Sequence, residues 1–150
     1  MFERFSEAAR RSLFYALYNT AARAGDAITE DDLLCGILTA APGAVTLLAP
    51  ALVISPSHER RAVLVRVDRD ETLIGFIENR VPLTTVARTV LGRAAQEAND
   101  LGQEVIEPEH LILALLQQED SQAFRTLQTA GVKLQDARRI VSGTQEEGGS

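Results

Sequence analysis

The chain has 150 residues, enough to bury about 70% of the surface that the unfolded chain exposes. Its 45% hydrophobic and 24% charged residues are typical of a soluble globular protein. The net charge of −6 disfavours binding to nucleic acid or to an anionic membrane, and the single cysteine, Cys35, excludes an intrachain disulfide.

Helical spacing of apolar residues predicts two helices at the start of the chain. The first follows Ser6, a preferred N-cap residue, with an apolar stripe that begins at Ala9 and a predicted stop at Gly25. The second follows Thr29, ahead of an acidic first turn in which Asp32 stands at the spacing of a capping box. Both starts therefore have residues that can satisfy free N–H groups at a helix N-terminus.

The stretch from residue 42 to residue 80 is less regular. Three prolines leave room for only a short third helix over residues 44–49, and Ser57 can cap a fourth helix. Within residues 62–80, alternating and β-rich runs favour a small hairpin, which competes with a helix that continues from His58. We expect this stretch to be a linker that packs on the two halves of the chain.

An internal repeat organises the chain, because subtracting 78 from positions in the second half gives matching residues in the first half without a gap. We therefore expect a first helical repeat over residues 1–61, the linker over 62–80 and a second repeat over 81–142. The polar, glycine-rich residues 143–150 are predicted to form a disordered tail. The identical pairs are Ala9/Ala87, Arg10/Arg88, Leu13/Leu91, Ala16/Ala94, Ile28/Ile106, Leu33/Leu111, Leu38/Leu116, Arg60/Arg138 and Arg61/Arg139.

The second repeat has its own helix signals. Thr84 stands at the position of Ser6 as a predicted N-cap, and Gly102 supplies the stop of the same helix. Glu107 is expected to cap the next helix, with Pro108 at the first helical position, where its missing N–H costs nothing. Two shorter helices are expected at Gln122–Ala130 and Gln135–Ser142.

Three segments carry a family resemblance: MFERFSEAARR, VPLTTVARTVLGRAAQEANDLG and EPEHLILALL. Together they resemble the N-terminal domain of Clp-family unfoldase ATPases, ClpC in particular. The resemblance implies an all-α fold of two four-helix repeats related by a pseudo-twofold axis. The sequence has no G-x-x-x-x-G-K-[ST] motif, so the chain resembles the substrate- and adaptor-docking module without any ATPase module.

The resemblance also implies a ligand. In the family, the N-terminal domain of ClpC binds phosphorylated arginine, with a hydroxyl at the start of the first helix on the phosphate and a carboxylate on the guanidinium. Carried over by position, the residues are Ser6 with Asp31 in the first repeat and Thr84 with Glu109 in the second. The alternative is that all four residues only cap helices, which N-terminal preferences explain singly.

Aromatic residues gather near the N-terminus and suggest a second kind of site. Phe2, Phe5 and Tyr15 are candidates for an exposed patch that docks peptides or adaptors. The alternative is that these rings pack against the linker or the core.

Patterns for catalysis, cofactors or metals are missing from the sequence. His110 beside Glu109 lacks a second ligand at the next turn, where Ala114 stands, and His58 lacks the partners of a catalytic triad. We therefore expect a non-catalytic module with no cofactor and no metal site.

The expected partners are protein clients, an adaptor or a Clp ATPase, in regulated proteolysis or protein quality control in the cytoplasm. One alternative is a free-standing regulator that sequesters the ligands of a Clp ATPase. Another is a helical enzyme whose catalytic residues the sequence does not reveal, and a DNA-binding helical protein is disfavoured by the net charge.

Overall fold

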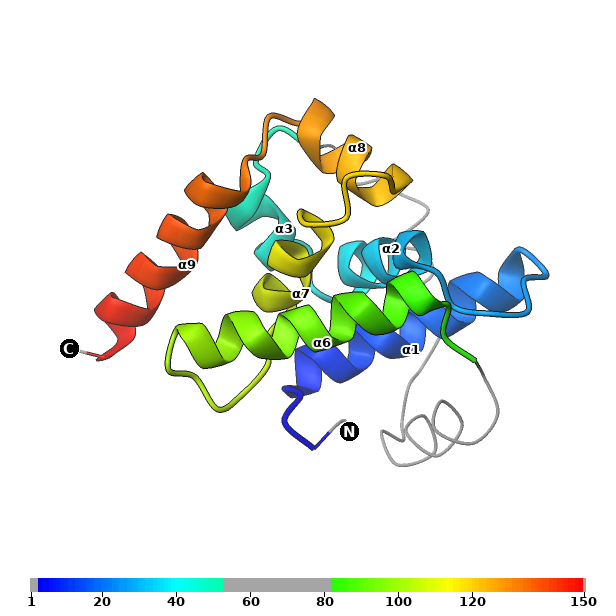
Figure 1. The fold of residues 1–150 in the computed structure, drawn as a ribbon, viewed down its shortest axis with the longest axis horizontal. Coiled ribbons are helices and arrows are strands. Elements are labelled where there is room, and N and C mark those ends of the chain that lie inside the picture. Colours follow the sequence, from blue (N-terminus) through cyan, green and yellow to red (C-terminus); the bar gives the residue numbers. More distant parts are fainter. Residues whose placement is uncertain (1–2, 53–81, 150) are drawn as a thin grey trace.

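A computed structural model describes residues 3–52 and 82–149 of the chain (Figure 1). Within these ranges the secondary structure is helical throughout, without a strand, which confirms the all-α prediction. The fourth helix of the first repeat, with its cap at Ser57, and the linker over 62–80 lie outside the described residues. The described helices are α1 (Glu7–Ala22), α2 (Glu30–Ala40), α3 (Pro42–Leu48), α6 (Thr85–Asp100), α7 (Pro108–Leu115), α8 (Gln122–Thr129) and α9 (Leu134–Gly149).

The first helix of each repeat begins where its N-cap residue predicts. The Ser6 hydroxyl accepts a hydrogen bond from the Ala9 N–H at 3.1 Å, and the Thr84 hydroxyl accepts one from the Ala87 N–H at the same distance. These bonds satisfy N–H groups that have no partner inside the helix. Both predicted caps are confirmed.

The ends of α1 and α6 are also alike, but α1 does not use the predicted glycine. Gly102 has a left-handed φ of 72° after α6, and the equivalent residue after α1 is Ala24, with a φ of 57°. The Gly25 N–H donates to the Thr20 carbonyl and the Gln103 N–H to the Ala98 carbonyl, both at 2.8 Å, as in Schellman caps. The stop predicted at Gly25 therefore falls one residue late.

The second helices also begin as predicted. Thr29 caps α2 in a reciprocal capping box with Asp32, and Pro108 occupies the first position of α7 after Glu107. In α7 the Glu107 N–H donates to Nδ1 of His110 at 2.8 Å, so the histidine replaces the usual acid of the box.

The bounds of the remaining helices differ from the predicted ones. The helix α3 starts at Pro42 because proline suits a first helical position, two residues before the predicted start. The helix α9 runs to Gly149, through residues 143–149 that composition assigns to a disordered tail. The helix continues through this segment because each added residue extends an existing helix at little cost, and because glutamine and glutamate are good helix formers.

Two reciprocal backbone bridges join the repeats. Phe5 pairs with Ile106, and Ile28 pairs with Leu83. In each bridge, a residue just ahead of the first helix of one repeat pairs with a residue just ahead of the second helix of the other repeat. Adding 78 to Phe5 and Ile28 gives Leu83 and Ile106, so the two bridges are the same contact made twice. This exchange is what a pseudo-twofold axis requires.

The helices α2 and α7 form the centre of the molecule. Both helices pack on α1 and on α6, the first helices of the two repeats, and they also pack on each other. The five residues from Leu111 to Leu115 have no exposed surface, so α7 is buried on every side. Figure 1 shows α7 among the other helices, with α6 in front of it, α8 above it and α9 to its left.

Each repeat buries one acidic side chain near the end of its first helix. In the first repeat this is Asp32, 1% exposed, which accepts hydrogen bonds from Arg23, Asn19 and Thr20. Burial alone would raise the pKa of Asp32, but these bonds and one from the Thr29 N–H outweigh it and hold the pKa well below its ordinary value.

In the second repeat the buried acid lies on the first helix, α6, and not on the second helix, α7. The position of Asp32 is taken by His110, and the position of Asn19 is taken by Glu97, which is 5% exposed. Glu97 accepts a bond from Gln117 at 2.7 Å and a fork from Arg138, whose nearest contact is 2.6 Å. This ion pair ties α9 to α6, whereas the Arg23 pair closes the end of α1.

A glycine sets the distance between α1 and α2. A Cβ atom on Gly36 would lie 2.0 Å from the Ser12 carbonyl oxygen and 2.8 Å from the Ala16 nitrogen, both backbone atoms. We expect Gly36→Ala to lower the free energy of unfolding by about 1–3 kcal/mol, because the helices must separate. In the control Gly92→Ala, the new Cβ would meet open space, so this variant should raise the free energy of unfolding by about 0.5–1 kcal/mol. Urea unfolding measures both, and equal effects of the two variants would contradict the close contact.

The buried Asp32 predicts a pH-dependent stability. Because its folded pKa lies below that of the unfolded chain, the ionised form stabilises the protein above about pH 4 and this contribution is lost as the pH falls through the folded pKa. We expect Asp32→Asn to cost about 2–3 kcal/mol at pH 7 and progressively less as the pH falls below about 4, with the difference vanishing only below the folded pKa. The exposed Asp120→Asn is the control. Urea unfolding at pH 7 and at a series of values from pH 4 downward tests this, and a loss that stays constant over the whole series would show that the carboxylate is not responsible.

Candidate functional site

The predicted site residues meet across the repeats and not within them. The Ser6 N–H donates to the Ile106 carbonyl at 3.0 Å, so Ser6 lies at the start of α7, because Ile106 is three residues before Glu109. The start of α2 lies at the other end of α1, because Asp32 is hydrogen-bonded to Asn19. The 16-residue α1 is about 24 Å long. The pairing of Ser6 with Asp31 is therefore wrong, and Ser6 shares a junction with Glu109.

The second junction repeats this geometry. The Thr84 N–H donates to the Ile28 carbonyl at 3.0 Å, which brings Thr84 to the start of α2 and to Asp31. The expected pairing of Thr84 with Glu109 is wrong for the same reason. We name the two places the α1–α7 junction (Ser6, Arg10, Glu109) and the α6–α2 junction (Thr84, Arg88, Asp31).

Within the described part of the chain, the Glu109 carboxylate has no partner other than its own backbone N–H. It occupies the first turn of α7, where it is half-buried, and no cationic side chain of residues 3–52 and 82–149 forms an ion pair with it. Burial and the nearby charge of Glu107 raise the pKa of Glu109 above its ordinary value. A carboxylate in this position gains from a cationic hydrogen-bond donor.

Arg10 adds a cation to the same junction. It lies one helical turn after Ser6, and its Nε is buried without a hydrogen-bond partner. Sequence reasoning missed Arg10 as a site residue, although its recurrence as Arg88 in the repeat was visible. The start of α1 thus combines a helix N-terminus, a hydroxyl and a guanidinium, and the bond from Ser6 to Ile106 brings the start of α7, with the Glu109 carboxylate, to the same junction.

Asp31, by contrast, already has a partner. Its Oδ1 accepts a hydrogen bond from the Ala123 N–H at 2.7 Å, at the start of α8 in the other repeat. This N–H belongs to the first turn of α8 and has no acceptor within its own helix. Asp31 therefore caps a helix of the second repeat.

The predicted aromatic docking patch is not present on the surface. Phe5 is 5% exposed and belongs to the core, where its backbone pairs with Ile106, and Tyr15 is 8% exposed with Phe14 against its ring. Phe2 lies outside the described residues. Since Phe5 and Tyr15 are buried, they cannot present a surface to a partner, which corrects the prediction.

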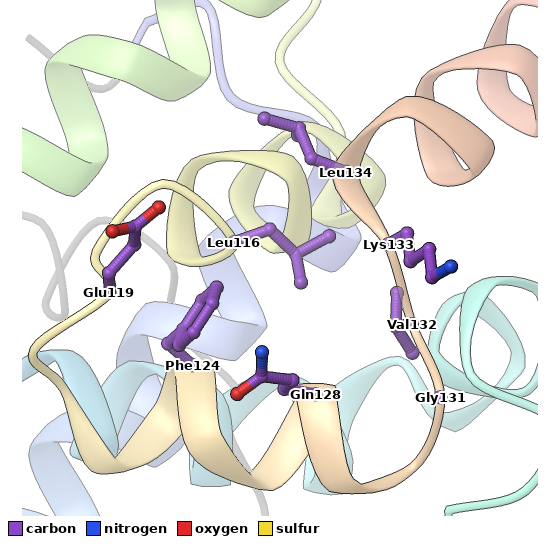
Figure 2. Close-up of a pocket in the computed structure, with 8 residues that line it drawn as sticks. All are labelled: Leu116, Glu119, Phe124, Gln128, Gly131, Val132, Lys133 and Leu134. Atoms are coloured by element: carbon purple, nitrogen blue, oxygen red, sulfur yellow. The ribbon is translucent and has the colours of Figure 1, made fainter.

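An open cavity of about 310 Å³ lies between the end of α7, α8 and the connection to α9. Its walls are mainly apolar, and Figure 2 shows Glu119 and Lys133 on opposite sides of it. None of its residues belongs to either junction. The lining residues are Leu116, Glu119, Phe124, Gln128, Gly131, Val132, Lys133 and Leu134.

Among the described residues there is neither a metal-binding cluster nor a single helix that could span a membrane. No three side chains of His, Cys, Asp or Glu gather there in a way that could hold a metal ion. In the same ranges no single helix has the length and apolar composition to cross a bilayer; α2 and α3 reach them only when taken together, and a bend of 104° separates the two.

Comparison with known proteins finds one family to which the chain is similar. Residues 82–148 match the Clp repeat (R) N-terminal domain. Over 141 residues, 94% of this chain, the sequence is 28% identical to an ATP-dependent Clp protease ATP-binding subunit ClpA homolog of Trieres chinensis. It is 27% identical to the chloroplastic chaperone protein ClpC2 of Oryza sativa subsp. japonica. The chain spans only 16% of the length of each of these relatives.

Solved structures share the fold. The N-terminal domain of the chaperone ClpD from Arabidopsis thaliana superposes with a TM-score of 0.67 at 20% identity, covering 97% of this chain and 99% of that one. The Hsp104 N-terminal domain from Candida albicans gives a TM-score of 0.61 at 17% identity, covering 92% and 89%. The chain therefore has the fold of these N-terminal domains, and its residues 82–148 are similar in sequence to the Clp repeat (R) N-terminal domain, in line with the resemblance of its motifs.

Proposed function

We propose that this domain docks protein clients, or the adaptors that carry them, for a Clp ATPase. The relatives are named as chaperones and as ATP-binding subunits of a protease, and the chain matches about a sixth of their length. The chain itself lacks a phosphate-binding motif for ATP. A docking role without catalysis is what such a part would supply.

We further propose that the docked group is phosphorylated arginine. The observation that carries this proposal is Glu109, a half-buried carboxylate with a raised pKa and no cationic partner among the described residues. Its two oxygens can accept the paired N–H donors of a guanidinium.

The phosphoryl end of the ligand would lie at the start of α1. There the Ser6 hydroxyl, the first N–H groups of the helix and the positive end of its dipole favour an anion. The Arg10 guanidinium, whose Nε lacks a partner, adds a charged donor one turn away. Opposite charges at the two ends of the α1–α7 junction thus match a ligand that is cationic at one end and anionic at the other.

Glu109 tests this proposal directly. We expect Glu109→Gln to weaken binding of a phosphoarginine-containing peptide at least about tenfold, because a hydrogen bond between charged groups contributes about 1.5–3 kcal/mol. Fluorescence anisotropy with a labelled peptide measures the affinity, and the same peptide with unmodified arginine or with phosphoserine is the control ligand.

The pH dependence has a defined sign. The bound form needs an ionised Glu109, so affinity should fall as the pH drops through the raised pKa of this carboxyl, and Glu109→Gln should remove that part of the dependence. Equal binding of the phosphorylated and unmodified peptides would rule out phosphoarginine and leave a general docking surface.

A further inference from the structure

We infer that the start of α7 carries a pH-sensitive switch. The backbone bridge between the repeats at this point holds while His110 is neutral, and it opens when the buried imidazole takes up a second ring proton. The equivalent bridge at the start of α2 has an aspartate in place of the histidine and does not respond in the same pH range. The switch concerns how the two repeats hold together, so it acts whether or not a ligand binds there.

The contacts of His110 fix its protonation state. The residue has no exposed surface, and its Nδ1 accepts a hydrogen bond from the Glu107 N–H at 2.8 Å. Because a backbone N–H can only donate, Nδ1 must offer its lone pair, and the ring proton lies on Nε2. This Nε2 is buried and has no hydrogen-bond partner among the described residues. The start of α7 is therefore built around the neutral imidazole.

A second ring proton would break the capping contact of α7. Both nitrogens of an imidazolium are donors, so Nδ1 of His110 would face the Glu107 N–H as one donor against another. The Glu107 N–H would lose its acceptor, and a positive charge would be buried in the core. Burial accordingly holds the pKa of His110 below its ordinary value.

The charges around His110 do not offset this cost. Glu97 on α6 favours the imidazolium, but its charge is already paired with Arg138 of α9, and Arg4 ahead of α1 disfavours it. On α7 itself, Glu109 acts with the opposite sign, because acid neutralises a carboxylate whose pKa burial has raised. The other elements packed on α7 contribute Arg10 from α1 and no charge from α3, and the acids of α2 lie at the other end of α1.

The capping contact is joined directly to a bridge between the repeats. Ile106 precedes Glu107; its carbonyl accepts the Ser6 N–H at 3.0 Å, and its N–H donates to the Arg4 carbonyl at 2.7 Å. One stretch of backbone thus holds both the start of α7 and the segment that leads into α1. Loss of the Glu107 bond therefore loosens this bridge as well.

The equivalent bridge has a capping box that resists acid. Asp32 takes the place of His110, and it accepts the Thr29 N–H at 2.9 Å. A carboxylate accepts in its ionised form, and the pKa of Asp32 lies well below its ordinary value, so this box stays intact at pH values where a histidine titrates. The Ile28 and Thr84 amides form this second bridge. It is a control within the same molecule.

Hydrogen exchange of the whole chain, followed by NMR, tests the switch. The chain carries Glu109→Gln, which removes the opposing titration. An open bridge exposes a histidine with a pKa of about 6.5, so between pH 7.5 and pH 5.5 the protection factors of Ser6 and Ile106 should fall more than about twofold and at most about tenfold. Those of Ile28 and Thr84 should change less than about twofold. Protection factors already correct for the direct effect of pH on exchange.

The matched variant is His110→Gln in the same chain, because a glutamine in a capping box can accept the same backbone N–H and does not titrate. It should make the Ser6 and Ile106 protection factors independent of pH. A fall of less than about twofold at Ser6 and Ile106 with His110 present would overturn the switch. An equal fall at both bridges would also overturn it, since the whole domain would then be opening, and this comparison decides even where His110→Gln fails to fold.

Discussion

The reciprocal exchange of backbone hydrogen bonds between the repeats is the constraint on which the rest of the structure depends. The Ser6 N–H bonds to the Ile106 carbonyl and the Thr84 N–H to the Ile28 carbonyl. Each bond places the start of a first helix beside the start of the other repeat's second helix. Any ligand that touches both a cap hydroxyl and an acid of the second helix must therefore bind between the repeats.

Signals of short range could be read from the sequence with success. The caps Ser6, Thr84 and Thr29 work through hydrogen bonds to residues within one turn, so their identity alone fixes where a helix begins. The offset of 78 residues showed the duplication for a similar reason, since equivalent helices need equivalent buried residues. The fold class followed from these two features and from the family motifs.

Contacts between distant residues could not be read in the same way. The repeat shows that Asp31 and Glu109 are equivalent, but it cannot show whether a residue meets its partner within a repeat or across the axis. The bond from Ala123 to Asp31 depends on where α8 begins relative to α3, a matter of helix register. The burial of Phe5 and Tyr15 likewise depends on packing that composition does not specify.

The bridges have a consequence for how the chain can fold and assemble. Arg4 and Glu104, which bond beside the Phe5 bridge, are 100 residues apart in sequence, so this contact can close only after most of the chain exists. Such a high contact order slows folding. Since the contact is isologous, the first repeat of one molecule can make the same bonds with the second repeat of another. The duplication therefore brings with it a route to domain-swapped dimers in which both bridges are kept.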